Sequence, residues 1–126
     1  MAKEEEEGKY KLYVETNPQV FNRRKYPRMP LSNTCFIKVL EEEGSFTGRM
    51  VNISANGFAF ACRDNMFADI KGDHVVVEVK DFGVINRPLE GTIIRSTNND
   101  GEYIVGCRMP QDSESIKNYV EQNYSE

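Results

Sequence analysis

The sequence has few of the residues that build metal centres and disulfide frameworks. Its 126 residues include one histidine and three cysteines. Cys35, Cys62 and Cys107 show no C-x-x-C spacing, and an odd number of cysteines makes a poor disulfide framework. One histidine with three scattered thiols also lacks the usual ligand set of a zinc site. We therefore expect no metal, no cofactor and a reducing compartment, the cytoplasm.

Long apolar runs are missing as well. The opening residues, MAKEEEEGKY, lack the apolar core of a signal peptide. No stretch approaches the ~20 apolar residues of a membrane helix, so we expect no membrane insertion. No nucleophile pattern accompanies His74, which we expect to be a surface or edge residue. These absences favour a binding protein over an enzyme.

Positive charge is scarce overall but concentrated in one segment. The chain has 16 lysines and arginines against 20 acids, a net charge of -4, which disfavours a nonspecific nucleic-acid binder. Residues 22–30, here called the arginine arm, nevertheless contain Arg23, Arg24, Lys25 and Arg28 and no acid. The arm is therefore the first candidate site for an anion.

The composition of the arm suggests both its conformation and its chemistry. Its two prolines fix their own φ angles and bias the preceding residues toward extended geometry, which predicts an extended segment and not a helix. The planar guanidinium of arginine matches phosphate oxygens and can also stack on a purine. The arm alone also fits a solvated basic loop, or a nucleic-acid arm in which Tyr26 stacks on a base.

Short β-type runs separated by turn signals fill the middle of the chain. Each run has one apolar face, because its apolar residues alternate with polar ones. The sequence Asn98-Asn99-Asp100-Gly101 is typical of a hairpin turn. Six short strands at this spacing indicate a closed barrel or a small sandwich. We expect strands at residues 34–40, 46–53, 57–62, 74–80, 88–96 and 102–109.

The pattern changes after Pro110. Asp112 or Ser113 can cap a helix, and apolar Ile116, Tyr119 and Val120 follow at helical spacing. A helix of ~12 residues is marginal alone, so we expect it to dock on one opening or edge of the sheet.

A second candidate site lies where two of the expected strands meet. Asn52 and Ser54 are two residues apart at a strand end, so both side chains can offer hydrogen-bonding groups on one face. Gly57 follows, where a glycine permits a positive φ and lets a ligand approach the backbone closely. Alone, these residues also fit an ordinary Asn-Gly turn with local hydrogen bonds. We call residues 52–57 the polar turn.

Taken together, the two segments are more specific than either alone. R-x-x-x-R at Arg24 and Arg28, followed by [D/N]-x-S-x-x-G at Asn52, Ser54 and Gly57, resembles the PilZ domain family, whose bacterial members bind the second messenger cyclic di-GMP. The resemblance continues through residues 21–124. It includes Lys71-Gly72-Asp73 as a mid-domain turn and Ile104-Val105-Gly106-Cys107-Arg108 as a later strand.

The resemblance implies a fold, a ligand and a response. The fold would be a six-stranded antiparallel β-barrel with a C-terminal helix. The arm would close over cyclic di-GMP, with Arg24 and Arg28 holding phosphates and guanine faces while Asn52 and Ser54 read base edges. Arg23, directly before the motif, resembles an arginine associated with binding the ligand as an intercalated dimer. An unidentified protein partner would receive the signal.

Two departures from the family pattern limit what can be carried over. Asn52 stands where many relatives have aspartate, which replaces a pure acceptor with a mixed donor and acceptor. Ala59 stands where some relatives carry a further ligand-contacting side chain. A non-binding adaptor of the same fold and, less favoured, a nucleic-acid-binding barrel are the alternatives. We assign residues 1–20 to a flexible acidic segment and residues 21–126 to the binding domain.

Overall fold

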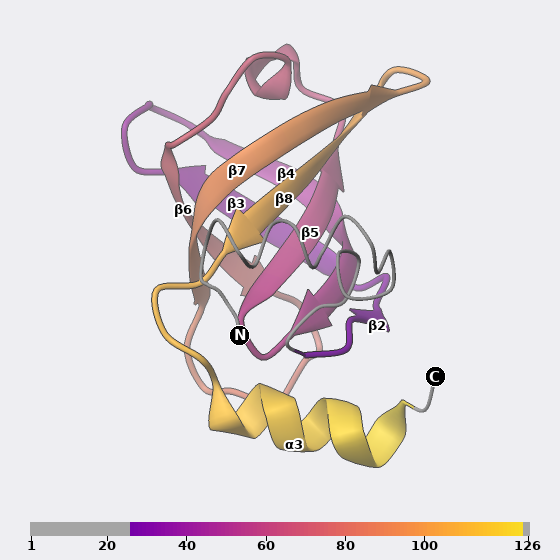
Figure 1. The fold of residues 1–126 in the computed structure, drawn as a ribbon. Coiled ribbons are helices and arrows are strands. Elements are labelled where there is room, and N and C mark those ends of the chain that lie inside the picture. Colours follow the sequence, from indigo (N-terminus) through magenta and orange to yellow (C-terminus); the bar gives the residue numbers. More distant parts are fainter. Residues whose placement is uncertain (1–25, 125–126) are drawn as a thin grey trace, which may run out of the picture.

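Six strands close into an antiparallel barrel in the computed structural model, which describes residues 26–124 (Figure 1). The barrel order is β4-β3-β6-β7-β8-β5, and β5 pairs back to β4. A further short strand, β2 (Met29–Pro30), pairs with the end of β4. The barrel strands are β3 (Thr34–Val39), β4 (Ser45–Ser54), β5 (Gly57–Cys62), β6 (His74–Val79), β7 (Leu89–Asn99) and β8 (Glu102–Arg108).

The predicted barrel with a C-terminal helix is confirmed, with small differences in strand length. The largest is in β7, which continues to Asn99 because it pairs with β8 up to the hairpin. Asp100 and Gly101 form that hairpin with φ angles of 59° and 86°, the left-handed geometry that a two-residue turn needs. The predicted flexible segment, residues 1–20, lies outside the described residues.

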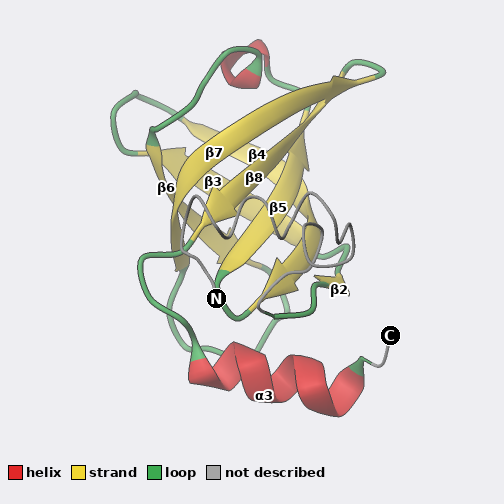
Figure 2. Ribbon diagram, in the orientation of Figure 1, coloured by secondary structure: helices red, strands yellow, loops and turns green. Residues whose placement is uncertain are grey.

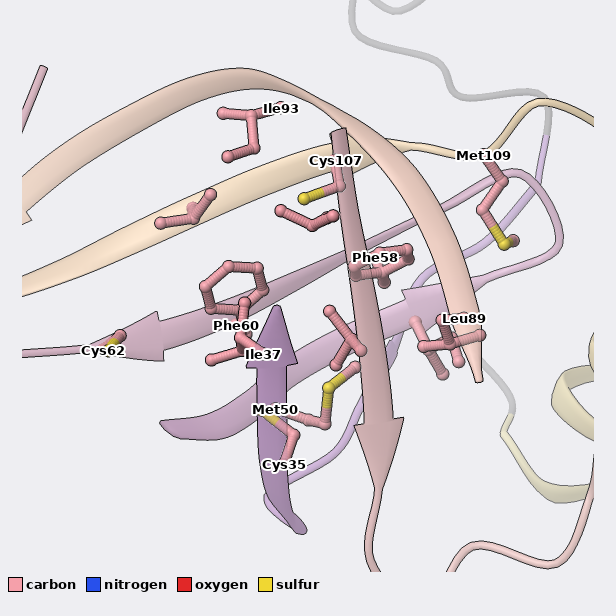
Figure 3. Packing of buried hydrophobic residues seen from close by; sticks show 14 of the residues in the cluster. Cys35, Ile37, Met50, Phe58, Phe60, Cys62, Leu89, Ile93, Cys107 and Met109 are labelled. Atoms are coloured by element: carbon pink, nitrogen blue, oxygen red, sulfur yellow. The ribbon is translucent and has the colours of Figure 1, made fainter. Parts of the chain in front are cut away.

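The core fills the inside of the barrel. Alternation along each strand directs one face inward, so Phe58 and Phe60 of β5 meet Ile37 of β3 and Met50 of β4, all at most 1% exposed. Figure 3 shows these side chains gathered between the strands. The ring of Phe60 packs edge-on against Phe67, with centroids 5.5 Å apart.

Helical segments lie beyond both ends of the barrel, drawn in red in Figure 2. The 3-10 helix η1 (Asn65–Phe67) is at one end and α3 (Glu114–Asn123) at the other. Of the two predicted caps, Ser113 is the one used, and its hydroxyl accepts a hydrogen bond from the Ile116 amide at 3.2 Å. As predicted, Ile116 and Val120 bury the apolar face of α3 against the barrel end.

Two β-bulges interrupt the barrel ladders. In β4 the register with β5 shifts between Met50 and Asn52. In β7 the register with β8 shifts between Ile93 and Arg95. Each bulge adds one residue and so reverses the alternation that follows it, which sends Asn52 and Arg95 to the outside of the barrel.

The three cysteines are free and buried in the barrel wall. Burial raises the pKa of Cys35 and of Cys107 to about 12, with the charge of Arg28 opposing the rise at Cys107. Because only the thiolate attacks disulfide reagents, we expect the folded protein to react with dithiobis-nitrobenzoate at pH 8 at least ~100-fold more slowly than the protein in guanidinium. Fast reaction of all three thiols in the folded protein would contradict this burial.

Candidate ligand-binding site

The arginine arm and the polar turn meet on the outer face of the barrel. Strand β2 aligns Met29 with Ile53 and Pro30 with Asn52, which brings the preceding residue, Arg28, to the end of β4. The Arg28 guanidinium donates from Nη1 to Oδ1 of Asn52 at 2.9 Å. One predicted arginine and one residue of the polar turn are therefore in direct contact across 24 positions of sequence.

Gly57 has a different role from the one expected from sequence. Positive φ angles occur at Gly44, Gly72 and Gly101, whereas Gly57 is the first residue of β5 and does not use the positive φ that glycine permits. What requires glycine there is close packing. A Cβ at position 57 would lie 2.8 Å from the Cys107 carbonyl oxygen and 3.2 Å from Nη2 of Arg28. Gly57 thus lets the Arg28 side chain lie against the barrel wall.

Ser54 is fully buried and takes part in local hydrogen bonds. Its hydroxyl donates to Oδ1 of Asn56 at 2.9 Å and lies 3.3 Å from the Gly57 carbonyl oxygen. This bonding holds the turn between β4 and β5, as expected of a serine beside an Asn-Gly pair. Asn52, in contrast, is half-buried and directed toward Arg28. A direct contact between Ser54 and a ligand stays a prediction.

The remaining predicted site residues, Arg23 and Arg24, lie outside the described part of the chain. Their roles therefore stay predictions. Their described neighbour Tyr26 makes a contact that sequence reasoning missed, because its hydroxyl donates to Oδ2 of Asp112 at 2.7 Å. The partners are 86 positions apart, and no local pattern marks such a pair. The arm is thereby linked to the segment that leads into α3.

A well-defined hollow in residues 26–124 lies elsewhere. It has a volume of about 770 Å³ and is lined by residues 83–90 and 109–116, none of which was predicted as a site residue. Its lining carries Arg87 against Glu90, Asp112 and Glu114. An excess of acids disfavours a dianionic ligand, whereas the surface at Arg28 and Asn52 offers a cation and an amide. Charge therefore favours the surface at Arg28 and Asn52 over this hollow.

His74, predicted as a surface or edge residue, is exposed, and its Nδ1 is hydrogen-bonded to Oε2 of Glu41. That bond is the main cause of the lowered pKa of Glu41. Within residues 26–124, no three His, Cys, Asp or Glu side chains are grouped so as to hold a metal ion. None of the helices in this range has the length and apolar character that crossing a bilayer requires.

Comparison with protein families identifies one match that covers most of the chain. The sequence profile of the PilZ domain matches residues 22–122. A comparison with curated proteins gives no significant match.

Solved structures with the same fold include the following three. The PilZ domain of YcgR from Escherichia coli with c-di-GMP has a TM-score of 0.60 at 14% identity, over 80% of this chain and 88% of that one. The Bacillus subtilis inhibitor of motility, MotI, has a TM-score of 0.61 at 15% identity, over 80% of this chain and 51% of that one. The K. pneumonia MrkH–c-di-GMP complex has a TM-score of 0.55 at 14% identity, over 80% of this chain and 49% of that one. This chain thus spans about half the length of the last two.

Proposed function

Because this chain belongs to the PilZ domain family, we propose that it is a receptor for cyclic di-GMP that works by ligand binding and not by catalysis. The observation that carries the proposal is the contact between Arg28 and Asn52. It joins the two family motifs on one surface of the barrel. The YcgR and MrkH structures, which have a similar fold and contain c-di-GMP, support the same ligand for this chain.

The chemistry of the ligand suits the residues at this surface. Cyclic di-GMP carries two phosphate charges and two flat purines, so it favours cations that also stack. Arginine supplies both in one side chain. The proposed site consists of Arg23, Arg24, Arg28, Asn52, Ser54 and Gly57. Asn52 retains its amide NH₂ as a donor while its Oδ1 accepts from Arg28.

Calorimetric titration of the full chain tests this function. We expect saturable binding of cyclic di-GMP and no binding of a single-stranded oligonucleotide. Binding of the oligonucleotide alone would instead support a nucleic-acid-binding barrel. Binding of neither by the folded protein would support a non-binding adaptor.

The proposed response is closure of the arm over the ligand in the cytoplasm, sensed by a downstream protein. The Tyr26–Asp112 hydrogen bond supports this step, because Asp112 lies directly before the Ser113 cap of α3. A ligand that moves the arm would change a contact that reaches the start of α3. The helix end would then differ between the empty and the bound protein.

Replacing Tyr26 by phenylalanine tests this link. We expect cyclic di-GMP to alter amide exchange at residues 114–117 in the parent but not in Tyr26→Phe, because the variant lacks the hydroxyl that reaches Asp112. Affinity should change by no more than about tenfold, the equivalent of one net hydrogen bond. The control is Tyr103→Phe, whose hydroxyl donates to Asn65. An unaltered exchange response in Tyr26→Phe would exclude this route.

Stoichiometry provides a separate prediction at Arg23. Two intercalated ligands carry four phosphate charges and expose more guanine surface than one ligand, so a third guanidinium can neutralise and stack where two would not. We expect about two ligands per chain for the parent and about one for Arg23→Leu in calorimetric titration. A parent value of one ligand would remove Arg23 from the proposed site.

A further inference from the structure

One row of residues crosses four strands on the outer face of the barrel and begins at Asn52. In the ladder registers Asn52 of β4 is opposite Ala59 of β5, Ala59 is opposite Gly106 of β8, and Gly106 is opposite Arg95 of β7. The two middle members carry only a methyl group and a hydrogen atom. At the spacing of neighbouring strands, the ends of the row are about 14 Å apart. We call these four residues the outer row.

The polar ends of the outer row owe their position to the two β-bulges. Ile93 points inward and is 1% exposed. Under regular alternation Arg95 would follow it into the apolar core, where a lone guanidinium is costly. The extra residue at the bulge turns Arg95 outward, and the bulge in β4 does the same for Asn52. Both ends of the row are thus directed outward by the same device.

The side chain of Arg95 lies over its neighbour in the row. A Cβ placed on Gly106 would lie 3.4 Å from Nε and 3.5 Å from Cγ of Arg95, so the arginine covers Gly106 of β8. Arg95 itself is exposed. Arg49 forms an ion pair with Glu102 at 2.8 Å, whereas Arg95 forms no ion pair with an acid of residues 26–124. Its charge is therefore not neutralised by an acid of the described chain.

We propose that Arg95 reads the guanine base of the bound dinucleotide and makes the site prefer guanine to adenine. The inference rests on the proposed function. A flat base lying against Ala59, beside the Arg95 side chain that covers Gly106, would direct its edge, not its face, toward the guanidinium. Arginine forms paired hydrogen bonds with O6 and N7 of guanine, whereas adenine presents an amino donor at the same place.

Calorimetric titration of the full chain with cyclic di-GMP and with cyclic di-AMP tests the proposal. We expect Arg95→Ala to weaken cyclic di-GMP binding roughly 5- to 150-fold, the usual range for one paired arginine–guanine contact, and to leave cyclic di-AMP binding unchanged. Arg95→Lys should recover only part of the loss, because charge returns without the planar fork. Arg87→Ala, at an exposed arginine in the loop before β7, controls for the loss of one positive charge.

The outcomes separate this inference from the proposed function. If the parent binds cyclic di-GMP and Arg95→Ala binds it within twofold, the role of Arg95 is overturned and the receptor function stands. Full recovery by Arg95→Lys, or an equal loss in Arg87→Ala, would reduce the effect to charge and also overturn base reading. If the folded parent binds neither dinucleotide, both proposals fail.

Discussion

Replacing Arg28 by alanine is expected to cost about 1.5 to 3 kcal/mol of cyclic di-GMP binding, the range for a charge-assisted contact. This corresponds to a loss of roughly 10- to 150-fold in affinity. The physical reason is twofold. The variant removes the guanidinium from the ligand, and it also removes the hydrogen bond that orients Asn52. Calorimetric titration of the parent and the variant under the same salt conditions gives the difference directly.

Two matched variants make the Arg28 result specific. Arg28→Lys keeps the charge but lacks the planar fork, so it should restore only part of the affinity. Arg63→Ala removes an exposed arginine just beyond the end of β5 and should leave binding close to that of the parent. Arg28→Ala with parental affinity would mean that the surface at Arg28 and Asn52 is not the binding site.

The largest expected effect on stability is at Phe60, which lies at the centre of the barrel. Phe60 is 0% exposed and packs edge-on against Phe67, which closes the barrel end at η1. Phe60→Ala should lower the free energy of unfolding by about 3 to 5 kcal/mol, because it removes buried surface and leaves a cavity. The total free energy of unfolding of a single domain is only about 5 to 15 kcal/mol. Urea unfolding followed by circular dichroism measures the loss.

An exposed phenylalanine is the control for Phe60. Phe36 lies on β3, is 44% exposed and has its side chain on the outer face of the barrel. Phe36→Ala should cost less than about 1 kcal/mol, within the range of strand propensity on a solvated face. Equal losses for the two variants would contradict the assignment of inner and outer faces.

Most of the fold could be predicted from the sequence because alternation and turn chemistry are local signals. The apolar face of residues 58, 60 and 62 defined β5 to the residue, and Asp100-Gly101 defined the hairpin. Strand β2 was missed because it has only two residues, one of them proline, and it forms only by pairing with β4. Such a strand has no pattern of its own.

The sequence predicted the two motifs of the site but not the contacts between them. The sequence indicated Arg28 and Asn52 as site residues, but their contact depends on the register between β2 and β4. The close packing of Gly57 against Cys107 depends on pairing with β8, which is distant in sequence. Arg95 was missed because a bulge decides which way it points. Long-range pairing decides each of these features, and no short window of sequence contains it.

The central claim is that this barrel binds cyclic di-GMP at the surface formed by Arg28 and Asn52. The most direct measurement is the change in amide exchange of the folded full chain on saturation with cyclic di-GMP, followed peptide by peptide. We predict slower exchange in the peptides that contain residues 22–30 and 52–57, with residues 74–79 of β6, which pairs with β3 and β7, unchanged. Unchanged exchange in both segments at saturating ligand would contradict the claim.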